Sequence, residues 1–378
     1  MSDWFLADDL SGSLDAGAAF RAAGRRVRLV EAADDWQPGP EGELVGVNTE
    51  SRNLPPEEAA ARVAATLAHA SARGARLVFK KIDSTLRGPL AAELAVVRRH
   101  FPGHRLLLCP ANPAAGRTVE HGQLLVRGVP VFATEFARDP AAPVREGDLR
   151  RLAPADAGWV IPDARDEGDL EAAIAAVAAP AGPWLAVGSG ALASPVARRL
   201  GGAESSSRPQ PYPAPGPVLF LGGSAHPLNR TQADRLAAAR GLTVIQAYPE
   251  APVIALAAGA AQLRSAGAAL VLAPEARARP ERIRDSIAAV GAALIGDHGV
   301  RRVFVTGGET ARALAARLGL RELIVAGTIE PGLVLATATS PATGPLLIAV
   351  KPGGFGDADT WVRGAAVLGG SGGAGATP

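Results

Sequence analysis

Short apolar runs alternate with longer, Ala-rich amphipathic segments along nearly the whole chain. Short apolar runs are typical of buried strands, and the amphipathic segments between them are typical of surface helices. Strands that alternate with helices form βαβ units on a mainly parallel sheet, so the pattern predicts an α/β fold. The strands expected in the first half are Trp4–Ala7, Val27–Val30, Leu44–Asn48, Leu77–Lys81, Leu106–Cys109, Trp159–Ile161 and Trp184–Val187.

A segment rich in Pro and Ser, residues 204–217, divides the chain, with five Pro and three Ser in fourteen positions. This composition is typical of a semi-rigid exposed linker. We therefore expect two α/β domains with mainly parallel sheets, residues 1–203 and 218–368, and a disordered tail, residues 369–378. The strands expected in the second domain are Val218–Leu221, Thr243–Gln246, Ala269–Leu272, Val303–Thr306, Leu323–Ala326 and Leu346–Val350.

Charge and composition exclude several classes of protein. The 39 basic and 37 acidic residues give a net charge of +2, and the basic residues are scattered, which argues against a nucleic-acid partner. No apolar stretch reaches the ~20 residues of a membrane span, and no signal-peptide pattern is present, so we expect a cytoplasmic protein. The single Cys109 excludes an internal disulfide, and the six His lack metal-ligand spacing, so no protein-built metal site is expected.

Two adjacent acids, Asp8 and Asp9, follow the first expected strand. In open α/β sheets, ligands bind beyond the carboxyl ends of the strands. Because successive residues of a strand point to opposite sides, one acid can face a ligand while the other caps the next helix. The alternative for either acid alone is that it only caps the helix expected to start near Ser13.

A second polar group follows the fourth expected strand and contains Lys81, Asp83, Ser84 and Arg87. By the period of two, Lys81 and Asp83 share one side of the strand and Lys80 takes the other. A cation, an acid, a hydroxyl and a guanidinium at one strand tip predict a pocket for an anionic, hydroxylated small molecule. The alternative is a solvated strand end whose Ser caps the following helix.

Residues 111–140 interrupt the alternation and predict a hairpin beside the sheet. This region holds two more polar clusters after a strand, residues 110–122 with Arg117 and residues 134–140. Arg and Gly in loops at the same sheet edge strengthen the interpretation as a pocket. For the second cluster, a plain surface hairpin is the alternative.

Three Gly-rich turns follow three expected strands of the second domain, at residues 222–224, 307–310 and 351–356. Such turns leave backbone N–H groups uncovered, and two of them open helices, where phosphate binds readily. Together they predict a nucleotide site. It is not a P-loop, because none of the three lysines follows a Gly.

A separate turn, Gly188–Ala193, also follows a strand and opens a helix, as a dinucleotide-binding turn does. The linker begins about ten residues later, which leaves no room for a second strand and its ribose-binding acid. A tight strand-to-helix turn is therefore the favoured interpretation.

In this order, the motifs resemble those of the four-carbon acid sugar kinase family. The resemblance covers nearly the whole chain and rests on Ala-Asp-Asp-Leu-Ser-Gly, Lys-Lys-Ile-Asp-Ser-Thr-Leu-Arg-Gly, Pro-Ala-Asn-Pro-Ala-Ala-Gly-Arg-Thr-Val, Glu-Phe-Ala-Arg-Asp-Pro, Gly-Gly-Glu-Thr and Lys-Pro-Gly-Gly-Phe-Gly. It implies an N-terminal domain that binds acid sugars such as threonate, erythronate or 3-oxo-tetronate, and a C-terminal domain that binds ATP. It also implies phosphate transfer to the terminal hydroxyl.

The resemblance also carries over individual residues. In the substrate domain its signatures contain Asp8, Asp9, Lys81, Asp83, Ser84, Arg87 and Arg117. The positions it associates with ATP are Ser224, Gly307, Gly308, Glu309, Thr310 and Gly353.

We therefore expect an ATP-dependent kinase whose site lies in the cleft between the two domains, with a sugar acid and ATP as its small-molecule partners. Arg87 and Arg117 are expected to bind the substrate carboxylate. Asp9 or Asp8 is the candidate base, with Asp9 preferred, and Mg²⁺ on the nucleotide is expected to neutralise phosphate charge. The alternatives are a non-catalytic sensor of sugar acid and nucleotide, and an NAD-dependent dehydrogenase built on Gly188–Ala193. The sequence leaves open which sugar acid is bound and whether the chain forms a homodimer.

Overall fold

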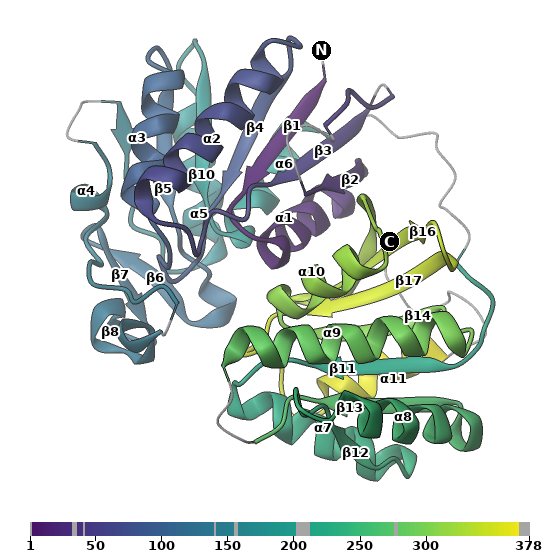
Figure 1. Ribbon diagram of the computed structural model, residues 1–378. Coiled ribbons are helices and arrows are strands. Elements are labelled where there is room, and N and C mark those ends of the chain that lie inside the picture. Colours follow the sequence, from purple (N-terminus) through teal and green to yellow (C-terminus); the bar gives the residue numbers. More distant parts are fainter. Residues whose placement is uncertain are drawn as a thin grey trace. The chain divides into compact units, whose positions relative to one another are not determined.

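The computed structural model describes residues 2–31, 36–40, 42–139, 141–154, 158–201, 212–275 and 279–369 (Figure 1). The chain divides into two compact units, residues 1–206 and 207–378. Each unit carries a stretch of sheet with helices packed on it, which confirms the expected α/β class. Part of the expected linker, residues 204–211, lies outside the described residues, as do residues 370–378 of the expected tail.

In the first unit, the strand order is β2-β3-β1-β4-β10-β5-β9, and all neighbours are parallel. All seven strands expected here are present, and the central strands β1, β3, β4, β10 and β5 are largely buried. The strands are β1 (Asp3–Ala7), β2 (Arg26–Val30), β3 (Glu43–Asn48), β4 (Arg76–Lys81), β5 (Arg105–Cys109), β9 (Trp159–Val160) and β10 (Trp184–Gly188).

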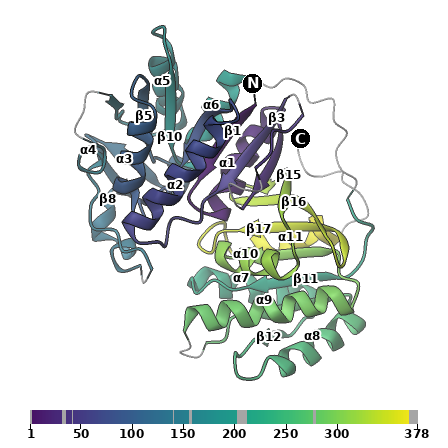
Figure 2. The same ribbon diagram turned by 45° about the horizontal axis from the view of Figure 1, so that its top comes forward.

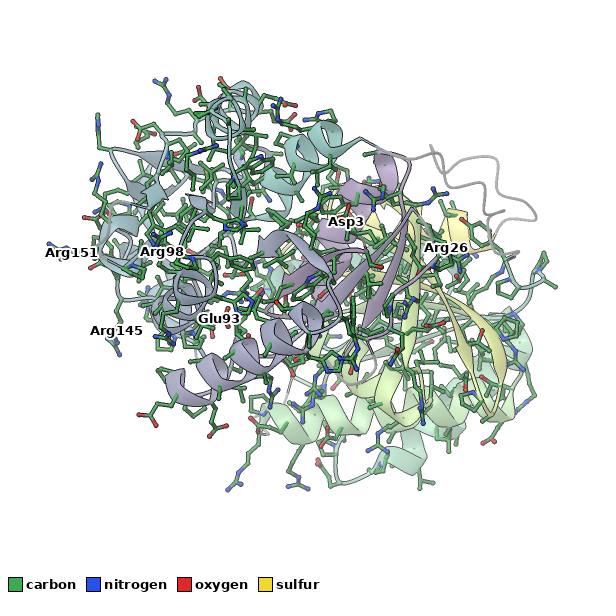
Figure 3. All side chains as sticks on the ribbon, turned by 90° about the horizontal axis from the view of Figure 1, so that it is seen from above. Asp3, Arg26, Glu93, Arg98, Arg145 and Arg151 are labelled. Carbon is green, nitrogen blue, oxygen red and sulfur yellow. The ribbon has the colours of Figure 1, made fainter. Side chains whose placement is uncertain are left out.

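The helices of this unit pack in two groups, α2 against α3, and α1 against α6 with α5 beside it (Figure 2). Their first turns follow the carboxyl ends of the strands, which places loops and helix starts at one edge of the sheet. The opposite edge is also charged. Asp3, which is labelled in Figure 3, lies there, and it binds both Arg25 and Arg76. The helices are α1 (Leu10–Ala22), α2 (Pro56–Ser71), α3 (Leu90–His100), α4 (Leu149–Leu152), α5 (Glu167–Ala178) and α6 (Gly190–Leu200).

The hairpin expected within residues 111–140 is present as a small three-stranded antiparallel sheet, β6 (Arg117–Glu120), β7 (Gln123–Val126) and β8 (Val129–Pro130). The turn between β6 and β7 has positive φ at both His121 (52°) and Gly122 (78°). Two left-handed residues match the twist of a two-residue hairpin. Short 3-10 helices precede and follow this sheet, η2 (Pro113–Ala115), η3 (Val131–Ala133) and η4 (Glu135–Arg138).

In the second unit, the strand order is β12-β13-β11-β14-β17-β16-β15. The first five strands are parallel neighbours, as expected, whereas β15, β16 and β17 form an antiparallel meander. The sequence analysis contains no strand for β16 and therefore misses this meander. The strands are β11 (Val218–Gly222), β12 (Val244–Gln246), β13 (Ala268–Leu272), β14 (Arg302–Thr306), β15 (Glu322–Glu330), β16 (Leu333–Ser340) and β17 (Gly344–Lys351).

The helices of the second unit include α11, whose last residue, Gly369, was expected in the tail. Helix α11 brings Trp361 onto Phe220 and Phe304, with ring centroids 6.4 and 5.0 Å away, respectively. No helix in the described part of the chain is long and apolar enough to cross a membrane. The helices are α7 (Pro227–Arg240), α8 (Pro252–Ala266), α9 (Pro280–Asp297), α10 (Gly308–Arg317) and α11 (Thr360–Gly369).

Candidate active site

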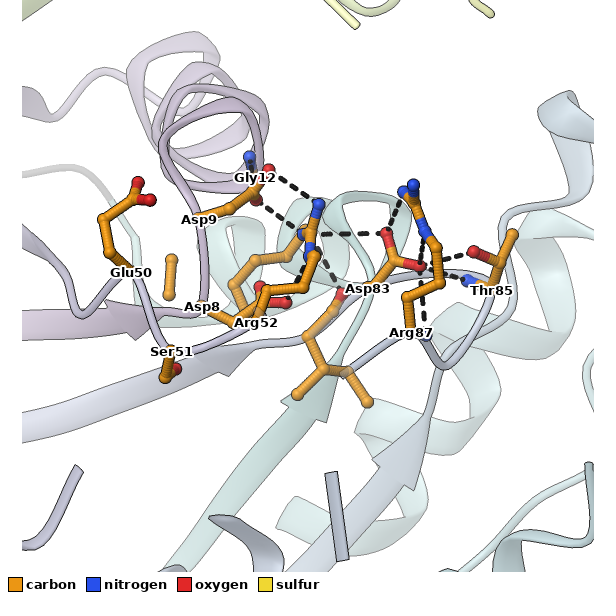
Figure 4. Close-up of polar contacts among 12 residues, drawn as sticks. Asp8, Asp9, Gly12, Glu50, Ser51, Arg52, Asp83, Thr85 and Arg87 are labelled. Atoms are coloured by element: carbon orange, nitrogen blue, oxygen red, sulfur yellow. Dashed lines mark hydrogen bonds and ion pairs between the residues drawn. The ribbon is translucent and has the colours of Figure 1, made fainter. Parts of the chain in front are cut away.

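Charged side chains from three neighbouring strands meet at the carboxyl edge of the first unit's sheet (Figure 4). They follow β1, β3 and β4, which lie side by side in the order β3-β1-β4. We call this group the carboxylate–arginine cluster. Its members are Asp8, Asp9, Arg52, Asp83 and Arg87.

Asp9 caps helix α1, because its Oδ1 accepts a hydrogen bond of 2.7 Å from the N–H of Gly12. The capping alternative is thus correct for Asp9, but capping does not exhaust its contacts. A Cβ at Gly12 would lie 2.6 Å from Asp9 Oδ1 and 2.7 Å from Lys81 Nζ. Glycine at this position therefore lets the acid and the lysine both approach the first turn of the helix.

Arg52 joins the two acids, and the sequence analysis missed it. Its Nε donates to Asp8 Oδ2 at 2.9 Å, and its Nη1 donates to Asp9 Oδ2 at 2.7 Å. The loop that carries Arg52 is tied to the end of β1, because the N–H groups of Ser51 and Arg52 both donate to the carbonyl of Asp8. The same strand-end rule that singled out Asp8 applies to the loop after β3 and could have identified Arg52.

Asp83 is saturated with donors from its own loop. Its Oδ2 accepts from Arg87 Nε at 2.9 Å and from the N–H and hydroxyl of Thr85, and its Oδ1 accepts from Arg87 Nη2 at 2.9 Å. The loop is strained, since buried Leu86 has a φ of 63°. Left-handed non-glycine residues are costly and cluster at functional sites.

Arg87 and Arg117 both lie over one aromatic ring. Each guanidinium carbon is 5.9 Å from the ring centroid of Phe136, which belongs to η4. Arg87 Nη1 also approaches Asp139 at 3.4 Å. Both polar clusters between residues 110 and 140 therefore contribute to this edge, and the surface-hairpin alternative does not account for Phe136 and Asp139.

The two lysines at the end of β4 point to opposite sides, as expected. Lys80 is fully buried and binds Glu93 of α3 at 2.7 Å. Lys81 is also buried and donates to the carbonyl of Ile82 at 2.9 Å, beside Gly12. A solvated strand end is therefore wrong for both lysines. Ser84, the remaining expected residue, lies in the turn after β4 and is partly exposed.

The cluster separates the pKa values of its acids. For Asp83, burial opposes ionisation, but Arg87 and Arg52 outweigh it and hold the pKa well below its usual range. Burial likewise opposes ionisation of Asp8, yet Arg52 and the two lysines lower its pKa. Burial raises the pKa of Asp9, and the charge of Asp8 adds to this effect against Arg52. Asp9 is thus the most basic of the three.

A further acid, Asp15, was not predicted from the sequence as a site residue. It lies on α1 against the first residue of α6, because a Cβ at Gly190 would lie 1.8 Å from Asp15 Oδ2. Burial raises its pKa, with Lys81 and Arg117 opposing and Asp9 reinforcing the shift. These couplings place Asp15 in the same electrostatic neighbourhood as the cluster.

In the second unit, the three Gly-rich turns converge. They follow β11, β14 and β17, which are adjacent in the sheet. A Cβ at Gly223 would lie 1.9 Å from Thr310 Oγ1, and one at Gly353 would lie 1.9 Å from Ser224 Oγ. Each glycine therefore lets one turn rest on a residue of another.

The turn after β14 opens helix α10 without a side-chain cap. Gly307 is the N-cap residue and has a φ of 101°, which glycine adopts without strain. Gly308 is the first residue of α10, so no side chain caps the N–H groups of the first turn of this helix. The side chain of Glu309 lies 3.5 Å from both Arg284 and Arg312.

The turn Gly188–Ala193 has a packing explanation. A Cβ at Gly188 would lie 2.2 Å from the carbonyl oxygen of Cys109 on neighbouring β5. Gly190 makes room for Asp15 in the same way. Close packing therefore accounts for both glycines without a dinucleotide.

Within the described residues, no three His, Cys, Asp or Glu side chains gather as a metal site would require. In the first unit, arginines form ion pairs with Asp8 and Asp83. In the second unit, Glu309 lies near two arginines.

Comparisons with known proteins agree with this arrangement. Residues 4–157 match the sugar-binding N-terminal domain family, and residues 219–361 match the nucleotide-binding C-terminal domain family. The chain is 32% identical to a D-threonate kinase of Bordetella bronchiseptica, over 96% of each chain. It is 28% identical to a 3-oxo-tetronate kinase of Methylobacterium radiotolerans, over 95% of this chain and 97% of that one.

Solved structures match in fold. A Haemophilus influenzae protein of 19% identity superposes with a TM-score of 0.71 over 97% of this chain and all of its own. A Salmonella typhimurium LT2 protein of 20% identity gives a TM-score of 0.77 over 96% of this chain and 98% of its own. Sequence identity and coverage together establish that the chain belongs to the four-carbon acid sugar kinase family.

Proposed function

We propose that the protein transfers the γ-phosphoryl group of ATP to the terminal hydroxyl of a four-carbon acid sugar, with D-threonate, D-erythronate and 3-oxo-tetronate as the acids to test. The observation that carries the proposal is the pairing of two unlike clusters in one chain. In the first unit, arginines, a lysine and acids lie together at the ends of neighbouring strands. In the second unit, glycine turns and the first turn of α10 lie together in the same way. The activities of relatives similar over nearly their full length support it.

The substrate carboxylate is proposed to bind at Arg117 and Arg87. Burial lowers the pKa of Arg117, Asp83 opposes that effect, and the charge of Arg87 adds to it. Two guanidiniums that lie near the same ring and repel one another favour an anion beside them. Arg87 already binds Asp83 through two nitrogens, so Arg117 is proposed to contribute more of the carboxylate binding.

Asp9 is proposed as the base that receives the hydroxyl proton. A base needs a carboxylate that is ionised at neutral pH yet basic enough to take a proton. Asp9 has the raised pKa, whereas the pKa values of Asp8 and Asp83 are lowered by their cationic partners. Asp8 and Arg52 then serve to hold Asp9 in place, since Arg52 binds both acids. Lys81, Asp83 and Ser84 are proposed to complete the substrate site.

ATP is proposed to bind the second unit through Ser224, Gly307, Gly308, Glu309, Thr310 and Gly353. Backbone N–H groups at a helix start and in glycine turns are suited to phosphate oxygens. Mg²⁺ is proposed to arrive on the phosphates and to supply charge neutralisation there.

Coupled ADP release tests the proposal directly. The enzyme is offered ATP and Mg²⁺ with each stereoisomer of threonate, erythronate and 3-oxo-tetronate, and with no acid as the control. Release that depends on one acid supports the kinase. If ATP and the acids bind without any turnover, the protein is a sensor and the kinase proposal is wrong.

A further inference from the structure

Lys351 is one of only three lysines in the chain and the only one in the second unit. It is the last residue of β17 and is fully buried. Its Nζ donates to the carbonyls of Pro352, Gly353 and Phe355 at 2.8, 3.0 and 2.9 Å. An ammonium group has three protons, so all of them are used within the loop that follows.

The main chain of Lys351 holds a second turn. Its carbonyl accepts a hydrogen bond of 2.9 Å from the N–H of Gly307, the N-cap residue of α10. One residue thus fixes the turn after β14 through its backbone and the turn after β17 through its side chain.

The inward carbonyls decide where the loop's N–H groups point. In a planar trans peptide, the carbonyl of one residue and the N–H of the next point in opposite directions. Because the carbonyls of Pro352 and Gly353 face Lys351, the N–H groups of Gly353 and Gly354 face away from it. No described residue accepts a hydrogen bond from either N–H. Two adjacent free N–H groups are a typical anion-binding arrangement.

The charge of Lys351 is costly to the fold. No described carboxylate lies within ion-pair distance of its Nζ, and burial lowers its pKa to about 8, with Glu330 opposing the shift. The carboxylate of Glu330 is itself bound to Thr360 and Arg363. A buried cation without an ion pair destabilises a protein relative to an apolar side chain of similar size. The three hydrogen bonds to the loop carbonyls offset part of this cost, and they fix the direction of those carbonyls.

We propose that Lys351 is a positioning residue for ATP, whose ammonium turns the loop so that the N–H groups of Gly353 and Gly354 face the phosphates, without touching the nucleotide itself. This inference rests on the proposed binding of ATP to the second unit. It differs from a P-loop lysine, which contacts phosphate directly, because every proton of Lys351 is already donated to a loop carbonyl.

The test compares Lys351→Met with wild type by titration calorimetry with Mg²⁺–ATP near neutral pH. We expect ATP affinity to fall about tenfold or more, and the KM for the sugar acid to stay within about twofold. The melting temperature is measured alongside, because the loss of the buried charge and the loss of three hydrogen bonds act on it in opposite directions. Arg363→Gln removes one cation near the same loop without touching its carbonyls, and it should bind ATP within about twofold of wild type.

A pH series on the wild type gives a second readout. The charged and titratable groups beside the loop are His226, next to Gly354, and Glu330, next to Gly356, with Arg363 bound to Glu330. ATP affinity should therefore weaken as pH rises through about 8, because the neutral amine no longer holds all three carbonyls. Lys351→Met should show a flat profile over the same range.

Each outcome decides the inference. A folded Lys351→Met that binds ATP as tightly as wild type overturns it, and so does a flat wild-type profile. If Lys351→Met does not fold, the wild-type pH series decides alone. If wild type does not bind ATP at neutral pH, the proposed function itself is wrong, which is a different result from an unaffected variant.

Discussion

At the carboxyl ends of β1, β3 and β4, charged side chains bind one another. At the ends of β11, β14 and β17, glycines have no side chain, so the turns pack closely against one another. Arg52 alone reaches Asp8, Asp9 and Asp83. In the other unit, Gly223 and Gly353 each rest on a hydroxyl-bearing residue of another turn. The first arrangement suits a small hydroxylated acid, whose charge and stereochemistry must be read. The second suits phosphates, which are alike in every ATP.

The largest effect is expected on kcat, from a substitution that keeps the shape of the carboxylate–arginine cluster. Asp9→Asn keeps the size of the side chain and the cap on α1, but the amide cannot take a proton. We expect kcat to fall about 10²- to 10⁴-fold with little change in substrate KM.

Asp8→Asn is the matched control, because its pKa is lowered and it is the weaker base. Melting curves for both variants guard against loss of the cap, which can cost about 1 kcal/mol. Near-normal kcat in Asp9→Asn would move the base elsewhere, with Asp15 as the next acid to test.

The next effect breaks the backbone site by adding atoms where there is no room. Gly353→Val places its side chain against Ser224, because a Cβ alone would come within 1.9 Å of Oγ. We expect ATP affinity to fall about 100-fold, the loss of two charge-assisted hydrogen bonds, in a protein that still folds. Gly296→Ala in α9 is the control, since a Cβ there meets nothing within 4 Å. Unchanged ATP affinity in Gly353→Val would mean that the turn is only structural.

A smaller effect on the KM for the sugar acid is expected at the two arginines that lie near Phe136, and it should differ between them. Arg117→Ala should raise the KM for the sugar acid about 10- to 100-fold and leave kcat near normal, because the carboxylate is bound in ground and transition states alike. Arg87→Ala should raise KM less, and it should also lower the melting temperature, since it leaves Asp83 without its bidentate partner. Steady-state kinetics on both variants measure the split. Equal KM values would contradict the proposed division between them.

The smallest effect is expected at Cys109, the last residue of β5 in the first unit. The thiol is fully buried at the end of β5, and burial raises its pKa to about 12. Thiol alkylation at neutral pH should therefore leave activity unchanged, since the thiolate is the reactive form. Inactivation by iodoacetamide that ATP or the sugar acid prevents would show that this strand end opens in the free enzyme and is covered when substrate binds.

The strand-end rule was enough to find Asp8, Asp9, Asp83 and the three glycine turns from sequence. It depends only on alternation and on the direction of parallel strands. It could not reveal that Arg87 is already bound to Asp83, because that pairing depends on a left-handed Leu86 in the loop. Strand β16 was missed for a related reason. Its partners in the antiparallel meander are joined by short turns, and the βαβ pattern contains no such connection.

The contacts of Gly223 with Thr310 and of Gly353 with Ser224 also bear on how such enzymes diverge. A methyl group added at either glycine disturbs two turns at once, so we expect substitutions at both positions to be selected against. An exchange of a partly exposed side chain such as Ser84, in the turn after β4, changes charge or length without forcing one backbone turn away from another. New acid specificities should therefore arise on the first unit, while the second unit passes nearly unchanged from ancestor to descendant.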